Sequence, residues 1–418
     1  MILLELFGEV FMKNVVVIGG GASGIVASIF AKRKNNRVIV LERNSDVLKK
    51  LLMTGNGKCN YLNEVYGTKY YHSTDIDIVD KIISDKNIND VKTFFDDLGI
   101  VPKIKNGYYY PVTNQAQTIK NALVYEAKRV GVELVCNCLV KEVIKEKDRF
   151  IIKTDGEDYQ ADYVVFATGS CAYPKTGSDG LGYDFLKRFK HQIVEPVPAL
   201  VQVVSDEKFL KKWDGVRTDA ILSLFEDENY LKEEMGEVQL TSYGLSGICT
   251  FNLSHDISRG LALKKKEEIH INFVPFIETL ISPWLDNYSK QSPDKNLTTL
   301  LEGFLNYKLV SIILDRCNLA GNLLYKDLDN KQKLLLCKML RSFPVNIVGT
   351  KDFSSAQICN GGVRLTEIDY NTMESKLVKN LFITGELLDM NGNCGGYNLT
   401  TCWISGLLAG KKIGDECD

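Results

Sequence analysis

A run of glycines between two apolar segments constrains this chain more than any other feature of its sequence. Residues 15–18 read Val-Val-Val-Ile, which is typical of a parallel strand buried on both faces, and they lead directly into the glycine loop at residues 19–24. Residues 25–30 carry apolar positions at helical spacing, and residues 38–41 form a second apolar run. This order of strand, loop, helix and strand predicts a βαβ unit within an α/β fold.

Each glycine of the Gly-x-Gly-x-x-Gly loop has a different physical role. Gly19 permits the tight turn, Gly21 lets the backbone approach a pyrophosphate, and Gly24 lets the helix pack against the strand. The start of the helix offers unpaired N–H groups and a positive dipole to phosphates. Glu42 closes the second strand, where its carboxylate is placed to bind an adenosine ribose. The loop therefore predicts a bound dinucleotide.

Two later segments decide between NAD and FAD, because the loop alone fits either. An apolar strand at residues 163–167 runs into a small-residue turn at Thr168 and Gly169. Another apolar strand, residues 381–383, ends at Gly385 and Glu386 and precedes a glycine-rich turn and a final helix. We expect Glu386 to bind ribityl hydroxyls and the amide groups that begin the last helix to face the flavin ring, where reduction places negative charge. This arrangement favours FAD.

A third segment, just after Glu42, is too rich in glycine, polar and cationic residues for a simple linker. Residues 49–60 read Lys-Lys-Leu-Leu-Met-Thr-Gly-Asn-Gly-Lys-Cys-Asn. The first candidates for catalysis are Lys58, Asn60 and Tyr173, because they are polar groups on segments expected near the flavin ring. Their alternative role is FAD binding or loop structure.

The candidate FAD-binding residues come from these segments and from positions beside them. They are Gly19, Gly21, Ala22, Ser23, Gly24, Glu42, Arg43, Lys50, Leu51, Asn56, Gly57, Lys58, Cys59, Asn60, Val140, Ala167, Thr168, Gly169, Gly385, Glu386, Gly395, Gly396, Tyr397, Asn398 and Leu399. We expect no metal site, because the four histidines are far apart and the close cysteines Cys136 and Cys138 would point to opposite faces of a strand.

The chain resembles the BaiN-like flavoprotein family, whose members are also called aminoacetone oxidase family FAD-binding enzymes or NAD(P)/FAD-dependent oxidoreductases. The similar residues are 49–60, 172–178, 243–247, 361–363, 372–376, 385–386, Asp389 and 395–399. The resemblance covers essentially the whole chain from Met12. It implies a Rossmann-type, glutathione-reductase-like FAD domain with an inserted β-barrel-like domain and a small helical insert.

Three segments depart from the usual pattern of that family. Lys58 stands in place of an arginine, so that a point charge replaces a bidentate fork. Thr400 stands in place of a glutamine, and Cys359 and Asn360 precede Gly361 where a small residue is usual. We expect these changes to leave FAD binding intact and to alter the pocket over the flavin.

The pattern of apolar residues changes along the chain and predicts three domains. We assign residues 12–195 and 355–418 to the FAD-binding domain. Residues 196–275 and 343–354 are assigned to a β-rich inserted domain, because short β-like runs occur at 199–204, 220–225, 237–241 and 269–273. Residues 276–342 are leucine-rich at helical spacing and are assigned to a helical insert. Residues 1–11 are expected to lie outside the fold, because Met12 almost directly precedes the first strand.

Composition and charge narrow the classes of partner. The chain has 418 residues and a formal net charge of -2, so that no broad basic field attracts nucleic acid. No apolar run reaches the roughly 18 to 20 residues that span a bilayer, and we expect no membrane partner. Eleven cysteines without a Cys-x-x-Cys pair fit a reduced, cytoplasmic chain. The oligomeric state stays open.

The leading functional prediction is an FAD-dependent oxidoreductase that takes hydride from NAD(P)H and reduces a small or steroid-like molecule, as the family resemblance implies. NAD(P)H is expected to dock transiently, because the chain contains no second Gly-x-Gly-x-x-Gly loop. The absence of a Cys-x-x-Cys pair argues against a disulfide substrate. One alternative is an oxidase of small amines or aminoacetone that releases peroxide. Another is a non-catalytic FAD-binding protein or an accessory protein of RNA modification, which the near-neutral charge disfavours.

Overall fold

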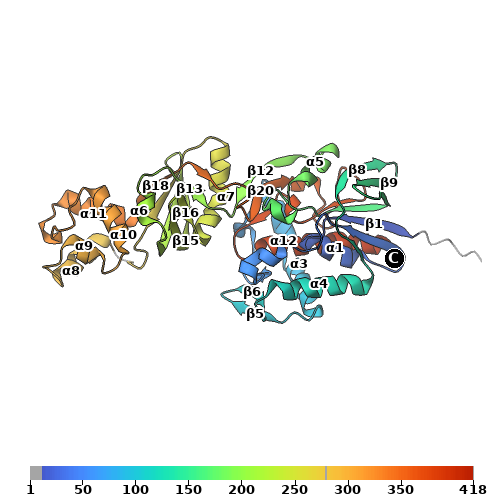
Figure 1. The fold of residues 1–418 in the computed structure, drawn as a ribbon, viewed down its shortest axis with the longest axis horizontal. Coiled ribbons are helices and arrows are strands. Elements are labelled where there is room, and N and C mark those ends of the chain that lie inside the picture. The colour runs from blue at the N-terminus through green and yellow to red at the C-terminus, as the bar shows by residue number, and fades with distance from the viewer. Residues whose placement is uncertain (1–11, 278–279, 418) are drawn as a thin grey trace, which may run out of the picture. The chain divides into compact units, whose positions relative to one another are not determined.

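The chain folds into two compact units in a computed structural model that describes residues 12–277 and 280–417 (Figure 1). The first unit comprises residues 12–196 and 358–417, and the second comprises the described residues of 197–357. The expectation for residues 1–11 lies outside the described residues. The division of the second unit into a β-rich domain and a helical insert stays a prediction. No helix in the described part of the chain is both long and apolar enough to cross a membrane.

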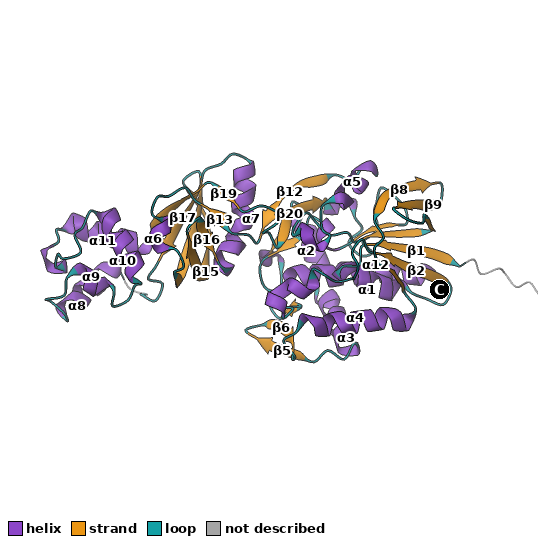
Figure 2. Ribbon diagram, viewed as in Figure 1, coloured by secondary structure: helices purple, strands orange, loops and turns teal. Residues whose placement is uncertain are grey.

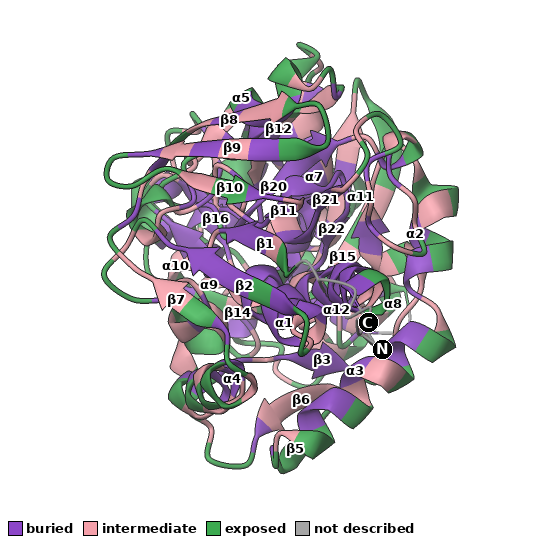
Figure 3. Cartoon of the chain, turned by 90° about the vertical axis from the view of Figure 1, so that its right-hand side faces the viewer, coloured by how far each residue is buried: buried purple, intermediate pink, exposed green. Residues whose placement is uncertain are grey.

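A five-stranded parallel sheet forms the centre of the first unit. Its strands follow the order β21 (Leu381–Ile383), β11 (Tyr163–Phe166), β1 (Lys13–Ile18), β2 (Asn36–Leu41) and β7 (Glu133–Val135). Residues 15–18 of β1 and the whole of β11 are buried, as their continuous apolar sequence predicts (Figure 3). The apolar runs that the sequence assigned to one sheet all pair within it, which confirms the Rossmann-type α/β fold.

Two helices from opposite ends of the chain pack in backbone contact. A Cβ atom on Gly406 of α12 (Tyr397–Cys417) would lie 2.5 Å from the carbonyl oxygen of Ser23 in α1 (Ala22–Ala31). A Cβ atom on Gly410 would lie 2.5 Å from the carbonyl oxygen of Ala27. The four-residue spacing puts both glycines on one face of α12, so that the last helix fixes the position of the first.

Smaller elements complete the first unit. Its other helices are α2 (Ile76–Ile82), α3 (Asp85–Asp97), α4 (Ala116–Val130) and α5 (Leu181–Arg188). Its small sheets are β10 (Tyr159–Ala161) with β9 (Arg149–Thr154) and β8 (Val140–Glu146), β3 (Leu62–Asn63) with β6 (Tyr108–Pro111) and β5 (Pro102–Lys105), and β22 (Asn391–Gly392) with β4 (Tyr71–His72). The chain leaves this unit through β12 (Ile193–Ala199) and returns through β20 (Ile358–Val363), which pair with each other.

A seven-stranded antiparallel sheet and a set of helices form the second unit (Figure 2). The sheet follows the order β18 (Phe343–Ile347), β17 (Glu267–Asn272), β14 (Arg217–Glu226), β15 (Asn229–Thr241), β16 (Gly244–Ser246), β13 (Val203–Val204) and β19 (Gly349–Thr350). The helices are α6 (Leu210–Trp213), α7 (Ile248–Ala262), α8 (Ile281–Lys290), α9 (Leu297–Leu301), α10 (Tyr307–Cys317) and α11 (Asn330–Arg341). Sheet residues such as Leu222 and helix residues such as Leu336 share one hydrophobic core.

Two segments differ from the expectation drawn from their sequence. Residues 199–204 are not one strand, because Leu200 adopts the left-handed conformation (φ 50°) between β12 and β13 and turns the chain. Helix α7 is absent from the sequence-based reading, since its Thr, Ser, Asn and β-branched residues have modest helix propensity. Burial of residues such as Leu253 and Ile257 in the core of the unit stabilises it instead.

A buried carboxylate lies where β17 begins. Glu267 is 1% exposed, and neither of its carboxylate oxygens has a hydrogen-bond partner among the described residues. Burial, followed by the negative charges of Glu226 and Asp256, raises the pKa of Glu267 to about 8. Lys265 opposes this shift only weakly, because its Nζ atom forms an ion pair with Glu226 at 2.6 Å. Glu267 is therefore mostly protonated in the folded chain at neutral pH.

We predict that the free energy of unfolding decreases as pH rises from about 5 to about 8, by at most about 1.4 kcal/mol per pH unit. Below the ordinary pKa of 4.5 both states hold the proton, whereas between 4.5 and about 8 only the folded state does. The stabilisation is thus complete at low pH and is lost as pH passes the folded pKa. Glu267→Gln should flatten this decrease, and Glu237→Gln, an exposed residue of β15, should not. Thermal unfolding at several pH values checks this, and identical pH profiles would contradict it.

Candidate flavin site

Four of the predicted segments meet at one edge of the parallel sheet. Gly19 follows β1, Glu42 follows β2, Ala167 follows β11, and Gly385 lies two residues after β21. These four strands are neighbours and run parallel, so that their carboxyl ends lie at the same edge. This edge is where open α/β sheets bind their ligands.

The three glycines of the first loop differ in what surrounds them. A Cβ atom on Gly19 would lie 2.4 Å from the carbonyl oxygen of Ala167, and one on Gly24 would lie 2.0 Å from the carbonyl oxygen of Gly19. A Cβ atom on Gly21, by contrast, would meet nothing closer than Ala167 at 3.9 Å. Packing within the protein thus requires glycine at 19 and 24. At position 21 the space is open, which fits the close approach of a ligand.

The start of α1 offers unpaired donors beside this space. No side chain in the described part of the chain caps the helix, and its first intrahelical hydrogen bond runs from the Ile25 amide to the Gly21 carbonyl oxygen. The amide groups of residues 22–24 therefore have no acceptor within the helix. Donors of this kind, on the positive end of a helix, fit the pyrophosphate of FAD.

The carboxylate of Glu42 is hydrogen-bonded to the glycine loop. Its Oε2 atom accepts a hydrogen bond from the Gly20 amide at 2.8 Å, and its Oε1 atom accepts two from Asn44, at 2.8 Å from the amide and 2.7 Å from Nδ2. A carboxylate accepts about four hydrogen bonds, so that one position is left for a ribose hydroxyl. The predicted contact with ribose stays a prediction.

Residues beside Glu42 connect two further loops to it. The Asn44 Nδ2 atom also donates to the Thr176 carbonyl oxygen at 2.9 Å, and Arg43 forms an ion pair with Asp179. The Cys138 amide donates to the Glu42 carbonyl oxygen, which places the segment before Val140 alongside. Val140 itself is 5% exposed at the start of β8, so that its side chain is a core group.

Lys50 and Ser170 hold the carboxylate of Glu386. The Lys50 Nζ atom lies 2.6 Å from Glu386 Oε2, and the Ser170 Oγ atom donates to the same oxygen at 2.9 Å. Lys50 also donates to the Ala172 carbonyl oxygen at 3.3 Å. Oε1 of Glu386 accepts no hydrogen bond from residues 12–277 or 280–417, which leaves an acceptor for a ligand hydroxyl. Two segments far apart in sequence, at Lys50 and Ser170, thus meet at a carboxylate that a third segment supplies.

Several predicted residues face the protein instead. Ser23 is buried, and its Oγ atom lies 3.2 Å from Thr384 Oγ1 and 2.5 Å from where a Cβ atom on Gly385 would be. The Thr168 Oγ1 atom is buried against Gly182 without a hydrogen-bond partner among the described residues. We infer that these hydroxyls set the spacing of the loops.

The loop of residues 49–60 is tightly wound around a short 3-10 turn, Leu51–Gly57. Its residues with positive φ are Gly55, Asn56, Gly57 and Cys59. For Asn56 and Cys59 this conformation costs on the order of 1 to 3 kcal/mol each, and such strain is often concentrated at functional sites. Cys59 is fully buried, which raises the pKa of its thiol to about 12, and Leu51 is a core residue.

The final glycine turn is held by side-chain amides. Asn398 donates from Nδ2 to the Gly392 carbonyl oxygen at 2.8 Å and accepts from the Gly392 amide at 2.9 Å. Asn63 donates to the Gly395 carbonyl oxygen at 2.9 Å. Tyr397 is buried and stacks on Tyr70, with ring centroids 4.8 Å apart. The half-buried Leu399 packs against the core of the first unit.

The three candidate catalytic residues have different surroundings. The Asn60 amide packs beside Gly396 and, oriented to satisfy its neighbours, donates to the Leu62 carbonyl oxygen at 3.0 Å and the Tyr109 carbonyl oxygen at 3.1 Å. Lys58 is exposed, and Tyr173 is half-buried with a positive φ of 58°. No contact joins these three side chains among the described residues. Their catalytic roles stay predictions.

The sequence-based reading missed two residues that organise this edge. Ser170 binds Glu386, and Asn44 binds Glu42 and the loop at Thr176. The available signal was position, because Ser170 directly follows the glycine turn and Asn44 lies two residues after Glu42. Small polar residues next to strand ends are common, so that position alone does not single them out.

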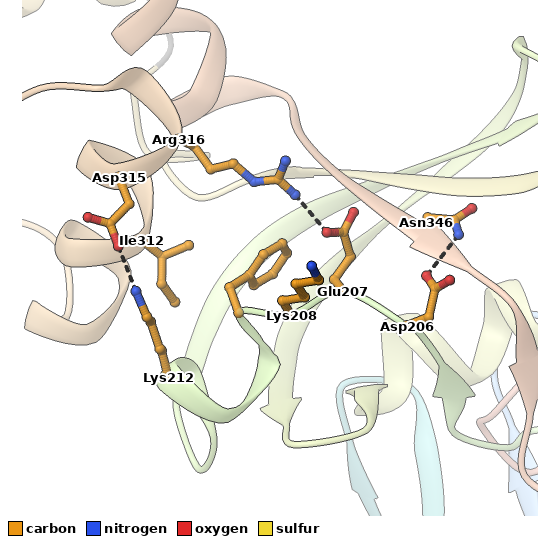
Figure 4. Close-up of a pocket in the computed structure, with 9 residues that line it drawn as sticks. Asp206, Glu207, Lys208, Lys212, Ile312, Asp315, Arg316 and Asn346 are labelled. Carbon is orange, nitrogen blue, oxygen red and sulfur yellow. Dashed lines mark hydrogen bonds and ion pairs between the residues drawn. The ribbon is translucent and has the colours of Figure 1, made fainter.

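A separate pocket of about 550 Å³ lies in the second unit (Figure 4). Two of its cations are paired, Arg316 with Glu207 at 2.8 Å and Lys212 with Asp315 at 2.7 Å, and Asp206 accepts a hydrogen bond from Asn346 at 3.0 Å. No residue predicted for the flavin site lines this pocket.

The chain is similar to known proteins over nearly its whole length. The chain matches the family described as HI0933-like protein Rossmann domain over residues 13–412. It is 35% identical over 408 residues to a 3-dehydro-bile acid delta(4,6)-reductase of Clostridium scindens, covering 97% of this chain and 100% of that protein. It is 25% identical over 402 residues to a ribosomal RNA dihydrouridine synthase of Escherichia coli, covering 96% of this chain and 98% of that protein. A flavocytochrome c3 fumarate reductase in an open conformation shares the fold, with a TM-score of 0.50 at 15% identity over 98% of this chain and 79% of that one.

We predict that Gly21→Ala and Gly24→Ala separate FAD binding from folding. The methyl group at position 21 has room in the protein, so that this variant should keep the stability of the FAD-free chain and bind FAD at least about tenfold more weakly, which is about 1.4 kcal/mol. The methyl group at position 24 collides with backbone and should cost about 1 to 3 kcal/mol of stability. Fluorescence titration with FAD and thermal unfolding of the FAD-free proteins measure the two effects. Unchanged FAD affinity in Gly21→Ala would show that no ligand passes this loop closely.

We also predict that Glu386→Gln weakens FAD binding about tenfold, or about 1.4 kcal/mol, because the change removes the charge that Lys50 and Ser170 orient. Glu133→Gln is the matched control, since Glu133 pairs with Arg37 on the same sheet near the opposite edge. The FAD dissociation constants of both variants and of the parent chain provide the measurement. Equal weakening by the two substitutions would rule out a specific role for Glu386.

Proposed function

Because the chain belongs to the HI0933-like protein Rossmann domain family and is an FAD-dependent oxidoreductase, we propose that it reduces a carbon–carbon double bond conjugated to a carbonyl group, with NAD(P)H as electron donor. The observation that carries this proposal is the likeness, over the whole length of both chains, to a bile acid delta(4,6)-reductase. The four segments that meet at the sheet edge all lie within the matched region.

The names of the two relatives describe one kind of chemistry. A 3-dehydro-bile acid delta(4,6)-reductase acts on ring double bonds near a 3-oxo group. Dihydrouridine is uridine reduced at the ring double bond that is conjugated to a carbonyl group. Reduction of a double bond of this kind adds hydride to the electron-poor carbon and a proton to its neighbour. This shared requirement supports a reductase rather than an oxidase.

The residues of the sheet edge would divide the work of holding FAD. The bound flavin supplies hydride transfer. The amide groups of residues 22–24 would bind the pyrophosphate, and Glu42 would bind the adenosine ribose. Glu386, oriented by Lys50 and Ser170, would accept hydrogen bonds from the ribityl chain. The first turn of α12 would direct its positive dipole toward the ring and stabilise the negative charge of the reduced state.

Substrate positioning and proton delivery would come from polar groups beside this edge. The hydrogen bonds from Asn60 to backbone carbonyl oxygens support a positioning role next to the final glycine turn. We propose Lys58 Nζ and the Tyr173 hydroxyl as the groups that bind the carbonyl of the substrate or donate the proton. Both side chains retain some exposure and could reach a bound molecule.

We favour a steroid-like small molecule over RNA as the substrate. Identity is 35% to the bile acid reductase and 25% to the RNA enzyme. The formal net charge of -2 also supplies little general attraction for a phosphate backbone. Ribosomal RNA is therefore the alternative substrate that the test must distinguish from a steroid.

We predict that NADH or NADPH bleaches the FAD-loaded protein under anaerobic conditions, and that a 3-oxo steroid with conjugated ring double bonds then restores the oxidised flavin spectrum. The saturated 3-oxo steroid of the same skeleton is the control and should leave the flavin reduced. Absorbance reports the flavin, and mass spectrometry of the steroid should show two added hydrogens for each double bond reduced.

Two other outcomes would contradict this proposal. Reoxidation by ribosomal RNA but not by the steroid would assign an RNA substrate. Bleaching by aminoacetone but not by NAD(P)H, with rapid peroxide release when oxygen is admitted, would assign an oxidase.

A further inference from the structure

Three consecutive tyrosines occupy strand β6, and the strand divides them between its two faces. Tyr109 packs against the core of the first unit, with its ring centroid 6.0 Å from that of Tyr61. Successive side chains of a strand point to opposite faces, so that Tyr108 and Tyr110 share the other face. Both are half-buried, and the hydrophobic core that the described residues form includes neither of them. Core packing therefore explains Tyr109 and leaves the other two rings without a structural reason.

The face shared by Tyr108 and Tyr110 adjoins both loops that the sequence places at the flavin ring. Tyr108 Cε1 lies 3.0 Å from where a Cβ atom on Gly395, in the final glycine turn, would be. Tyr110 Cε1 lies 3.7 Å from where a Cβ atom on Gly55 would be. The register agrees, because Asn63, the partner of Tyr108 on β3, donates its side-chain amide to the Gly395 carbonyl oxygen at 2.9 Å. The two rings thus border both loops.

The aromatic surface continues across the final glycine turn. The Cε2 atom of Tyr397 lies 2.9 Å from where a Cβ atom on Gly395 would be, so that a side chain there would collide with this ring and with Tyr108. The half-buried Tyr70 stacks on Tyr397, with 9° between the ring planes. Glycine at position 395 thereby makes room for aromatic rings that come from separate segments of the chain.

The spacing of the two free rings indicates the size of the ligand that they fit. Residues two apart in a strand are separated by about 7 Å, so that Tyr108 and Tyr110 together span more than a single nicotinamide ring and match a fused ring system. Burial, followed by the neighbouring Tyr108, raises the pKa of Tyr110. Its hydroxyl is therefore protonated at neutral pH and can donate a hydrogen bond to an oxygen at the edge of a ligand.

We propose that Tyr108 and Tyr110 form the wall against which the fused rings of the substrate lie at the flavin site. This inference rests on the proposed function, which makes the substrate a steroid-like 3-oxo compound with conjugated double bonds. Its flat, apolar skeleton leaves water by lying against aromatic rings, as in other pockets for small molecules. The wall positions the substrate and selects it by shape, while neither tyrosine takes part in hydride transfer.

The test measures binding without turnover, by equilibrium dialysis of the FAD-loaded chain with a 3-oxo steroid that has conjugated ring double bonds, in the absence of NAD(P)H. We expect Tyr108→Leu and Tyr110→Leu each to raise the dissociation constant of the steroid at least about tenfold, because the flat ring is lost. Tyr108→Phe and Tyr110→Phe keep the rings and should stay within about threefold of the parent chain. Tyr125→Leu, at an exposed position of α4, is the control and should bind as the parent chain does.

A second measurement needs no variant and covers the case in which a leucine variant does not fold. Ultraviolet irradiation excites the enone of the bound steroid, which then reacts with neighbouring groups of the parent chain. Mass spectrometry should find the adduct on the peptide that contains Tyr108 and Tyr110, and an excess of unirradiated steroid added afterwards should not remove it.

Three results would overturn the proposal: no steroid binding by the parent chain, unchanged binding by folded leucine variants, or an adduct found only on other peptides. A raised KM for NAD(P)H with an unchanged dissociation constant of the steroid would assign the wall to nicotinamide and would overturn it as well. Tyrosine-dependent binding without reduction of the steroid would count against the proposed reductase activity alone. Reduction with unchanged binding by the variants would count against the wall alone.

Discussion

The structure depends above all on the parallel pairing of β21, β11, β1 and β2. Four buried apolar strands lie side by side in one direction, so that every segment that leaves their carboxyl ends emerges at the same edge. A glycine loop, an acidic residue, a small-residue turn and a second acidic residue thereby become neighbours. The first and last helices, α1 and α12, pack against each other at glycines, whose lack of a side chain lets the two backbones come into contact.

The glycines at this edge serve two purposes that sequence alone does not separate. Gly19 and Gly24 are required by the protein, because any side chain there would collide with backbone atoms. Gly21 faces open space beside unpaired helix amides, which is the condition for a phosphate to approach. The same motif therefore combines a packing requirement with a binding requirement, and the two can be separated by substitution.

Charge at the site is organised by small networks rather than by isolated groups. Glu42 accepts hydrogen bonds from Gly20 and Asn44, which occupy most of its acceptor positions. Glu386 is held through one carboxylate oxygen by Lys50 and Ser170. Fixed carboxylates of this kind lose little freedom when they bind hydroxyl groups. In the second unit, burial raises the pKa of Glu267 to about 8, so that this carboxylate is mostly protonated at neutral pH.

The sequence by itself determined the strands, the first helix and the loop of the nucleotide fold, because these depend on local apolar periodicity and on where glycines stand. It also placed Gly19, Glu42 and Gly385 at strand ends, and hence at one edge. Helix α7, the turn at Leu200 and the partners of Glu386 escaped it, since they depend on burial and on contacts between distant segments.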